Sequence, residues 1–440
     1  MRGVLPVIYL SAFRSLSTYF TFAAKINFHY DDTELSPNPR ADLSSFRVTW
    51  NAPTENCKRK FGIDFRLKSY GIEENKKDGW AGQFITIFYK NDVGLYPYFD
   101  DQGNPVNGGI PQVVNLTAHL KKAATDIEKR IPDVNFNGQG VIDWEPWRPL
   151  YTRNWDSKKV YQEASKALVR QQHPTWGKAK VEAEAQRQFN MAARSMMEST
   201  MLLAEKVRPY GKWGYYEFPE CYNGKTGSRE CDAKAQSEND KLFWLFEACT
   251  AEYPSAYLNQ EWNHTHKAGF VHGQVQEGLR VARMGSGPPR PVYLYSRYQY
   301  SPLYPLYSKD DLIITIKQAS DLGAAGVVLW GDHYSEYNMS VCETMADFIH
   351  TTLGPTVAAI LNRTRTCEAT RCGSRGRCVL SKQWSAPQWL QLEKAAVEVW
   401  HEPAVERRRR LHDFYSNFFK CVREPFPESD VTYERMFIIL

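Results

Sequence analysis

Two carboxylates at the end of an apolar run are the residues best suited to do chemistry in this sequence. The segment 138–149 reads GQGVIDWEPWRP and carries Asp143 and Glu145. On a β-strand, this i, i+2 spacing places both side chains on one face, with Cβ atoms roughly 7 Å apart. Repulsion between two carboxylates in a poorly hydrated cleft raises one pKa, which keeps a proton available near neutral pH. Such a pair can protonate a glycosidic oxygen and stabilise the positive charge that develops on the sugar.

The same spacing also has a purely structural interpretation, because strand-end carboxylates can cap a following helix or pair with Arg148. Further strand-end candidates are aromatic. Tyr216, Tyr257 and Trp330 can stack on sugar rings, although packing in a core is the more common role of such residues taken singly. The sequence contains no Gly-rich phosphate loop, H-E-x-x-H helix or nucleophile elbow, and we expect no metal and no cofactor.

Alternating strands and helices must position these residues. Short β-branched and aromatic runs predict seven strands, over 46–50, 84–89, 140–144, 213–218, 255–258, 292–298 and 326–330. Stretches between them predict helices over 116–130, 158–170, 178–207 and 310–322. This alternation predicts an α/β fold with a parallel sheet and, over about 300 residues, a TIM-like (β/α) barrel. In a barrel, the C-terminal ends of the strands line the active site.

The composition is that of a globular protein. The 440 residues are 42% hydrophobic and 24% charged, which excludes a disordered or collagen-like chain. Aromatic residues make up 14%, which suits a cleft that binds flat rings. The net charge of +5 permits a polyanionic partner, but no nucleic-acid-binding motif is present. No run reaches the roughly 18 apolar residues of a transmembrane segment.

The pattern divides the chain into three parts. We expect an N-terminal segment over residues 1–40 that could include a signal peptide, a barrel over 41–362, and a small disulfide-rich module over 363–440. The cysteines of that module are not spaced as a zinc site. Clustered cysteines and four glycosylation sequons favour a secretory, hence secreted or lysosomal, protein. The sequons are at Asn115, Asn263, Asn338 and Asn362.

Ordered motifs of the sequence resemble the hyaluronidase family of glycoside hydrolases. The likeness centres on VIDWEPWRP at 141–149 and extends through WAGQFITIFY (80–89), LYPY (95–98), NWD (154–156), WGYY and FPECYN (213–223), YPSAY (253–257) and GAAGVVLW (323–330). The resemblance implies a distorted (β/α) barrel followed by an EGF-like module. It also implies hydrolysis of β-1,4 bonds between N-acetylhexosamine and glucuronate in hyaluronan, with chondroitin as a further substrate. We expect a monomer with a glycosaminoglycan partner.

The resemblance assigns roles to individual residues. It implies a retaining mechanism in which the substrate's own N-acetyl carbonyl attacks the anomeric carbon, an exception to the two-carboxylate scheme. Glu145 would be the acid/base, and Asp143 would position and polarise the acetamido group. The implied substrate-binding residues are Tyr216, Tyr257, Trp330, Tyr89 and Arg280.

The resemblance also implies a disulfide pairing, namely Cys57–Cys342, Cys221–Cys231, Cys367–Cys378 and Cys372–Cys421. Cys249 is left over as a free thiol. Because no cysteine follows Cys421, the EGF-like module is expected to be shortened by one bridge.

Two departures from the family's pattern keep a second hypothesis open. Gln274 stands where the family commonly has Arg, and Glu217 stands where small or apolar residues are usual. The second hypothesis is a non-catalytic glycosaminoglycan-binding or adhesion protein on the same fold. A third is a basic polyanion-binding protein without sugar chemistry.

Overall fold

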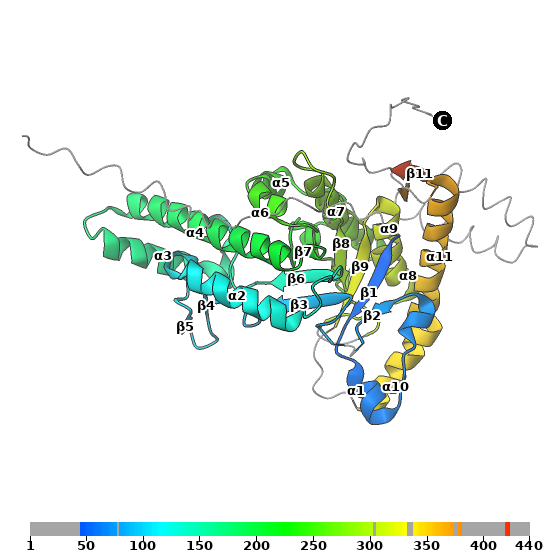
Figure 1. The fold of residues 1–440 in the computed structure, drawn as a ribbon. Helices are drawn as coiled ribbons and strands as arrows, with labels where there is room; N and C mark the ends of the chain where they lie inside the picture. The colour runs from blue at the N-terminus through cyan, green and yellow to red at the C-terminus, as the bar shows by residue number, and fades with distance from the viewer. Residues whose placement is uncertain are drawn as a thin grey trace, which may run out of the picture. The chain divides into compact units, whose positions relative to one another are not determined.

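The computed structural model describes residues 45–76, 79–301, 305–331, 338–373, 376–380 and 419–422 (Figure 1). The expected N-terminal segment over 1–40 lies outside these residues, and so does most of the expected module over 363–440.

Parallel strands form the centre of the fold. One sheet has the order β2-β1-β9-β8, and a second has the order β3-β6-β7. Their bounds are β1 (Arg47–Asn51), β2 (Glu73–Glu74), β3 (Ile85–Tyr89), β6 (Gln139–Asp143), β7 (Lys212–Tyr215), β8 (Tyr293–Ser296) and β9 (Gly326–Trp330). Every pair in these two sheets is parallel, as the alternation of strands and helices predicted.

Residues 252–255 join the two sheets on one side. Single parallel bridges link Tyr253 to Tyr216 after β7, and Ser255 to Tyr295 in β8. The prediction of a strand over 255–258 is therefore wrong. Pro254 has no N–H to donate to a ladder, so the chain here makes isolated bridges instead of a regular strand.

A side chain links the sheets on the other side. Asn75 follows β2, and its Nδ2 donates to the carbonyl of Ile85 in β3 at 2.8 Å. Its Oδ1 accepts from the backbone N–H groups of Phe84 and Ile85 at 3.1 and 3.3 Å. The barrel is distorted because this amide takes the place of a β-ladder.

Strand residues alternate between the barrel interior and the surrounding helices. Val141 lies in an interior cluster with Ile87 and Val328, whereas Ile142 packs on the outer side. Asp143 comes two residues after Val141 and so points toward the interior. Aromatic side chains pack against the interior cluster while remaining partly exposed, namely Trp80, Tyr89, Tyr216, Tyr257 and Trp330.

Eleven α-helices occur in the part of the chain that the structure describes. They are α1 (Glu55–Phe61), α2 (Leu116–Arg130), α3 (Lys159–Gln172), α4 (Lys178–Val207), α5 (Ala233–Asp240), α6 (Phe243–Ala248), α7 (His264–Ala282), α8 (Lys309–Leu312), α9 (Gln318–Leu322), α10 (Met339–Phe348) and α11 (Gly354–Arg371). The π-helical turns Ile313–Lys317 and Ile349–Leu353 join α8 to α9 and α10 to α11. The predicted helices 116–130 and 178–207 match α2 and α4, whereas the prediction missed α7 and α11.

Shorter elements complete the fold. The 3-10 turns are Leu67–Tyr70, Pro111–Val113, Tyr151–Arg153, Asp156–Lys158 and Asn223–Lys225. Two antiparallel strand pairs are β4 (Tyr98–Phe99) with β5 (Pro105–Val106), and β10 (Arg377–Leu380) with β11 (Phe419–Val422).

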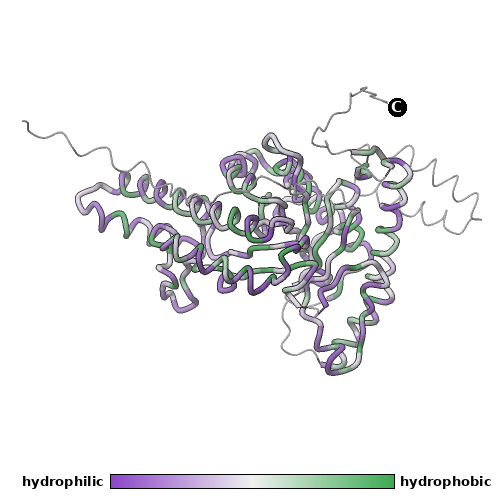
Figure 2. The backbone as a smooth tube through the Cα atoms, in the orientation of Figure 1, coloured by the Kyte–Doolittle hydropathy of each residue, from purple (hydrophilic) through white to green (hydrophobic). Residues whose placement is uncertain are grey.

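Helix α4 shows why these segments form helices against the sheet. Its buried residues recur every three or four positions, including Val181, Ala185, Phe189 and Ala193, which is the spacing of one helical face. Figure 2 shows hydrophilic and hydrophobic residues alternating along this helix. The apolar face packs with Phe88 and other outer residues of the β3-β6-β7 sheet, and α2 and α4 lie along that sheet (Figure 1).

Four disulfides lie within the described residues, and they are the pairs that the family resemblance implied. Cys57–Cys342 joins α1 to α10 across 285 residues. Cys221–Cys231 closes a loop after β7. The remaining bridges are Cys367–Cys378 and Cys372–Cys421, and Cys249 is a buried free cysteine.

The C-terminal bridges connect α11 to the β10-β11 hairpin. The division expected at residue 362 lies inside α11, which continues to Arg371 and carries Cys367. The chain is therefore helical, and not a linker, at that position. Among the described helices, none is both long and apolar enough to cross a membrane.

Candidate active site

The ends of three neighbouring strands bring the two predicted carboxylates to one place. Asp143 is the last residue of β6 and lies opposite Tyr89, the last residue of β3. The backbone N–H of Tyr216, just after β7, donates to the carbonyl of Ile142 at 3.0 Å. The parallel register therefore sets Asp143 between Tyr89 and Tyr216 at the C-terminal edge of the sheet, the edge where barrel active sites form.

Asp143 and Glu145 interact directly. Burial, repulsion from Glu145 and a hydrogen bond with Glu145 raise the pKa of Asp143 to about 9, and the carboxylate of Glu217 adds to the rise. Because the pKa of Asp143 lies above neutral pH, the pair holds a proton at neutral pH. The sequence predicted one raised pKa in the pair. The raised value belongs to Asp143 because its Oδ1 is buried, whereas Glu145 is exposed.

The backbone of Glu145 is fixed while its side chain remains exposed. Arg148 Nη1 donates to the carbonyl oxygen of Glu145 at 3.1 Å, and Lys158 Nζ donates to the same oxygen. Both cations bind the main chain here. The geometry therefore does not support the purely structural interpretation, in which Arg148 would bind the carboxylates of Asp143 and Glu145.

The predicted aromatic residues form a continuous wall beside the pair. Trp330 Nε1 donates to Tyr89 Oη at 3.1 Å. The rings of Trp330 and Tyr257 are stacked, with centroids 6.1 Å apart and planes 16° apart. Tyr257 and Tyr216 are hydrogen-bonded through their hydroxyls. Four of the five residues predicted to bind substrate thus lie together.

Three further residues belong to this wall, and sequence reasoning did not nominate them. The guanidinium of Arg297 lies over the rings of both Tyr257 and Trp330, at 4.9 and 4.7 Å from their centroids. Tyr295 packs edge-on against Tyr216 at 5.0 Å, and Trp80 packs edge-on against Tyr89 at 5.5 Å. Arg297 and Tyr295 lie in or next to β8, so their position at a strand end was the signal that could have found them.

Arg280 is not brought to the strand ends. It lies on α7, where its guanidinium pairs with Glu277 at 2.7 Å and with Asp240 at 2.8 Å. These two carboxylates belong to α7 and α5. The structure gives Arg280 a role in joining two outer helices, and it is not part of the wall that the other predicted residues form.

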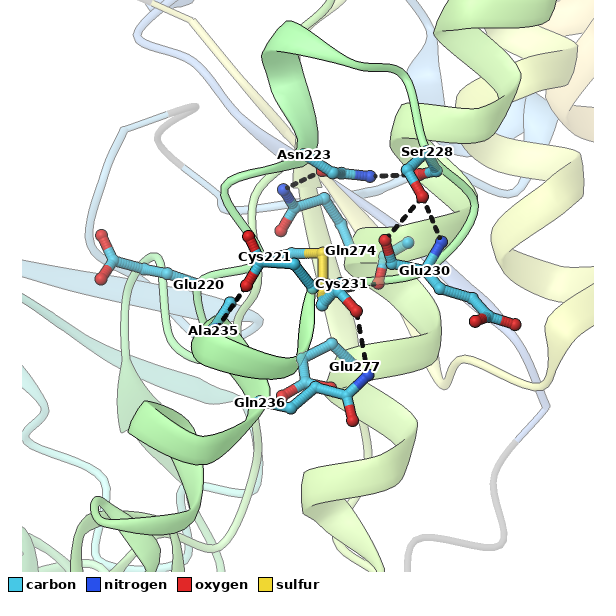
Figure 3. The surroundings of a disulfide bond; sticks show 12 residues. Glu220, Cys221, Asn223, Ser228, Glu230, Cys231, Ala235, Gln236, Gln274 and Glu277 are labelled. Carbon is cyan, nitrogen blue, oxygen red and sulfur yellow. Dashed lines mark hydrogen bonds between the residues drawn. A yellow bond between two sulfur atoms is a disulfide. The ribbon is translucent and has the colours of Figure 1, made fainter.

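Gln274 has a structural role as well. Figure 3 shows its side chain directed at Asn223, inside the loop that the Cys221–Cys231 disulfide closes. Gln274 Nε2 donates to Asn223 Oδ1 at 3.0 Å, and Asn223 Nδ2 donates to the carbonyl of Ser228 at 2.7 Å. Gln274 is only 6% exposed, so its side chain supports this loop from the protein interior.

An ionic cluster supports the carboxyl pair from the side of β7. Arg148 Nε donates to Glu220 at 2.8 Å, and Arg148 Nη2 donates to Glu217. Arg153 binds the other oxygen of Glu220 at 3.3 Å. This cluster holds the 145–148 segment against the loop after β7, which fixes the main chain that carries Glu145.

Within the described ranges, no group of three or more His, Cys, Asp or Glu side chains is arranged to hold a metal ion. What the site does present is an exposed carboxyl, a buried carboxyl that shares its proton, and a wall of aromatic rings with one guanidinium. This arrangement can bind a sugar by stacking and hydrogen bonding and can transfer a proton to it.

Comparison with known proteins agrees with this chemistry. A family model described as hyaluronidase matches residues 36–421. Hyaluronidase-1 of Bos taurus is 38% identical over 351 residues, which are 79% of this chain and 78% of that protein. Hyaluronidase-1 of Cerastes cerastes is 37% identical over 342 residues, 76% of each chain.

A solved structure of bee venom hyaluronidase in complex with a hyaluronic acid tetramer has the same fold. The TM-score is 0.67 at 38% identity, and the match covers 72% of this chain and 99% of that one. The fold is therefore the TIM-like barrel that the sequence predicted. From the family match and these identities, the chain belongs to the hyaluronidase family of glycoside hydrolases.

Proposed function

We propose that this protein is an endoglycosidase that hydrolyses the β-1,4 bond between N-acetylhexosamine and glucuronate in hyaluronan. The observation that supports this most directly is the Asp143–Glu145 pair, which shares a proton beside a wall of aromatic side chains while Glu145 stays exposed. The structure of bee venom hyaluronidase contains a bound hyaluronic acid tetramer, which supports the choice of substrate.

The reaction proceeds with retention and uses the substrate as its own nucleophile. The N-acetyl carbonyl oxygen attacks the anomeric carbon as the glycosidic bond breaks, and Glu145 gives its proton to the leaving oxygen. Glu145 then takes a proton from the water that opens the cyclic intermediate. The protein forms no covalent bond to the sugar.

Asp143 moves the shared proton to the residue that needs it. Its Oδ1 is buried and has no hydrogen-bond partner among the described residues. An acetamido N–H donating to this oxygen favours the ionised form of Asp143. The proton then resides on Glu145, where it can be donated, and the charge on Asp143 polarises the acetamido group for attack.

The aromatic wall orients the sugar for this step. In this proposal Tyr216 hydrogen-bonds at the acetamido group and Trp330 walls its pocket, with Tyr257 stacked on Trp330. Tyr89 is held by Trp330. Arg297 lies over both rings and helps to hold them in place.

Replacing the acid tests the proposal. Glu145→Gln should abolish hydrolysis of hyaluronan, measured by reducing ends and by product size, while thermal unfolding stays that of the wild type. Turnover above a few per cent of wild type would contradict the assignment. Binding of hyaluronan without shortening by the wild-type protein would instead favour the non-catalytic binder.

Digestion of hyaluronan and unsulfated chondroitin side by side tests the substrate range. Both polymers present a β-1,4-linked N-acetylhexosamine next to glucuronate, so we expect both to be cleaved. Products sized by chromatography would show the preference between them.

The protein is also proposed to act as a monomer in the secretory pathway, secreted or lysosomal. The four disulfides suit an oxidising compartment. The four sequon asparagines Asn115, Asn263, Asn338 and Asn362 are exposed. Three of them cap helices through their side-chain oxygen, which leaves the amide nitrogen of each for a glycan. Glycopeptide mass spectrometry of the protein from a eukaryotic host tests their occupancy.

A further inference from the structure

Glu217 is a third carboxylate that acts on the Asp143–Glu145 pair. It follows Tyr216 directly after β7, and its backbone adopts a left-handed conformation with φ 72°. Its N–H donates to the carbonyl of Tyr253 at 2.9 Å. A non-glycine residue in this conformation is uncommon and costs about 1 kcal/mol, so the surrounding contacts must hold the backbone in it.

The charged groups around Glu217 come from several elements. Arg148, on the segment after β6, binds it directly. Lys158 from the Asp156–Lys158 turn attracts it, whereas Glu220 from its own loop and Glu145 repel it. The groups that act on the neighbouring pair are Glu217, Arg148, Tyr89, Tyr216, Tyr257, Tyr295 and Lys158.

The charge count around Arg148 explains why Glu217 matters. Arg148 is already paired with Glu220 at 2.8 Å, and both side chains are buried. Glu217 binds the same guanidinium from the side that is more exposed, since 31% of its side chain is accessible against 5% for Glu220. Its charge thus adds to that of Glu220 around Arg148, and part of that charge acts on Asp143.

We propose that Glu217 is a positioning residue, which holds Arg148 against the loop after β7 and keeps the shared proton on Asp143 and Glu145 up to a higher pH. This inference rests on the proposed function, because the shared proton is the one that the glycosidic oxygen receives. It makes Glu217 a determinant of the pH range of the enzyme and not a group that touches the substrate.

The direction of the effect follows from like-charge repulsion. An ionised Glu217 raises the free energy of the ionised pair, so the pair keeps its proton to higher pH. Burial raises the pKa of Glu217 itself to about 7, although Arg148 opposes this rise. Glu217 therefore becomes charged as the pH rises toward neutral. Its effect on the Asp143–Glu145 pair grows over the same range.

The test is the pH profile of kcat/KM on hyaluronan for wild type, Glu217→Gln and Glu217→Gly. Glutamine keeps a hydrogen-bond acceptor for Arg148 but removes the charge. We expect the ratio of mutant to wild-type kcat/KM to fall by about three- to tenfold between pH 5 and pH 8, because the basic limb shifts down by about 0.5–1 pH unit. The loss should appear in kcat more than in KM, since the proton is used in the chemical step.

Two controls keep the outcome clear. Glu217→Gly suits the left-handed backbone, so it should fold even if the glutamine variant does not, and it should show the same shift. Glu198→Gln removes a carboxylate from a surface pair with Arg194 on α4 and should leave the profile unchanged. A wild-type profile parallel to those of both Glu217 variants would overturn the inference. Failure of wild type to cleave hyaluronan at any pH would overturn the proposed function instead.

Discussion

Two aspartates of this chain are withdrawn from water and respond in opposite ways. Asp143, at the end of β6, has its pKa raised to about 9 by burial and by Glu145. Asp321, on α9, is only 1% exposed. Burial acts to raise its pKa too, but Arg363 and Lys317 hold it below the ordinary value.

The difference lies in the partners and not in the burial. Lys317 Nζ lies 2.6 Å from Asp321, and Arg363 binds the same carboxylate from α11. Asp143 instead interacts with Glu145 and Glu217, two carboxylates that raise its pKa. A buried aspartate surrounded by cations is a structural anchor, whereas one beside other carboxylates stores a proton.

Neutralising Asp321 should give the largest change in the free energy of unfolding. Asp321→Asn leaves Lys317 and Arg363 facing a neutral amide in the interior, and we expect a loss of about 3–5 kcal/mol in the free energy of unfolding. Urea unfolding at pH 7 measures this loss. Glu198→Gln, which breaks a surface pair, should change it by less than about 1 kcal/mol. Equal losses in the two variants would show that Asp321 is not an anchor.

Neutralising Asp143 should lower the catalytic rate and not the stability. Asp143→Asn removes the charge that polarises the acetamido group, and we expect kcat to fall by about 10²–10³-fold, or about 3–4 kcal/mol of barrier. Stability should stay at the wild-type value or rise, because no cation loses its partner. Kinetics on hyaluronan and urea unfolding of the same preparation measure both. A large loss of stability with activity intact would reverse the assignment of the two aspartates.

The pH dependence of stability separates them further. Between the unfolded pKa near 3.8 and about 9, folded Asp143 binds more protons than the unfolded chain, so its contribution to stability falls as pH rises. Asp321 has a lowered folded pKa, so its contribution is present above about pH 4 and is lost in acid. From pH 4 to 9, Asp143→Asn should therefore gain stability relative to wild type, by no more than about 1.4 kcal/mol per pH unit. A constant difference across this range would contradict the raised pKa.

The smallest effect is expected in the aromatic wall. Trp330→Phe keeps a ring for stacking but loses the hydrogen bond from Nε1 to Tyr89 Oη. One such bond is worth about 1 kcal/mol, so the free energy of unfolding should fall by about that amount and kcat/KM by no more than about fivefold. Tyr89→Phe removes the same bond from the other side and should not add to the loss in the double variant. Fully additive losses would mean that the two rings act separately.

Much of the site could be predicted because parallel strands obey a simple rule. Asp143, Tyr89, Tyr216 and Trp330 each end or directly follow a strand, so a barrel brings them together whatever the helices do. The aromatic and β-branched runs located β3, β6 and β9 to within a residue or so. The run at 255–258 misled because apolar residues next to Pro254 resemble a strand but cannot form its ladder.

What escaped prediction depended on contacts between distant segments. Arg280 looked like a substrate-binding cation by motif, yet Glu277 and Asp240 take up its guanidinium. Arg297 looked unremarkable in sequence and came to lie over two rings of the wall. A charged side chain reveals its role only when its neighbours are known, because Coulomb interactions depend on distances that the sequence does not contain.

The sequence by itself determined the strand–helix alternation, the pairing face of Asp143 and Glu145, and the family to which the chain belongs, because these depend on local periodicity and on motif order. Only the tertiary structure decided which carboxyl of the pair has the raised pKa, and which cations serve the site rather than the scaffold. Protonation and pairing are set by burial and by partners that lie tens of residues away in the chain, and folding alone brings them within reach.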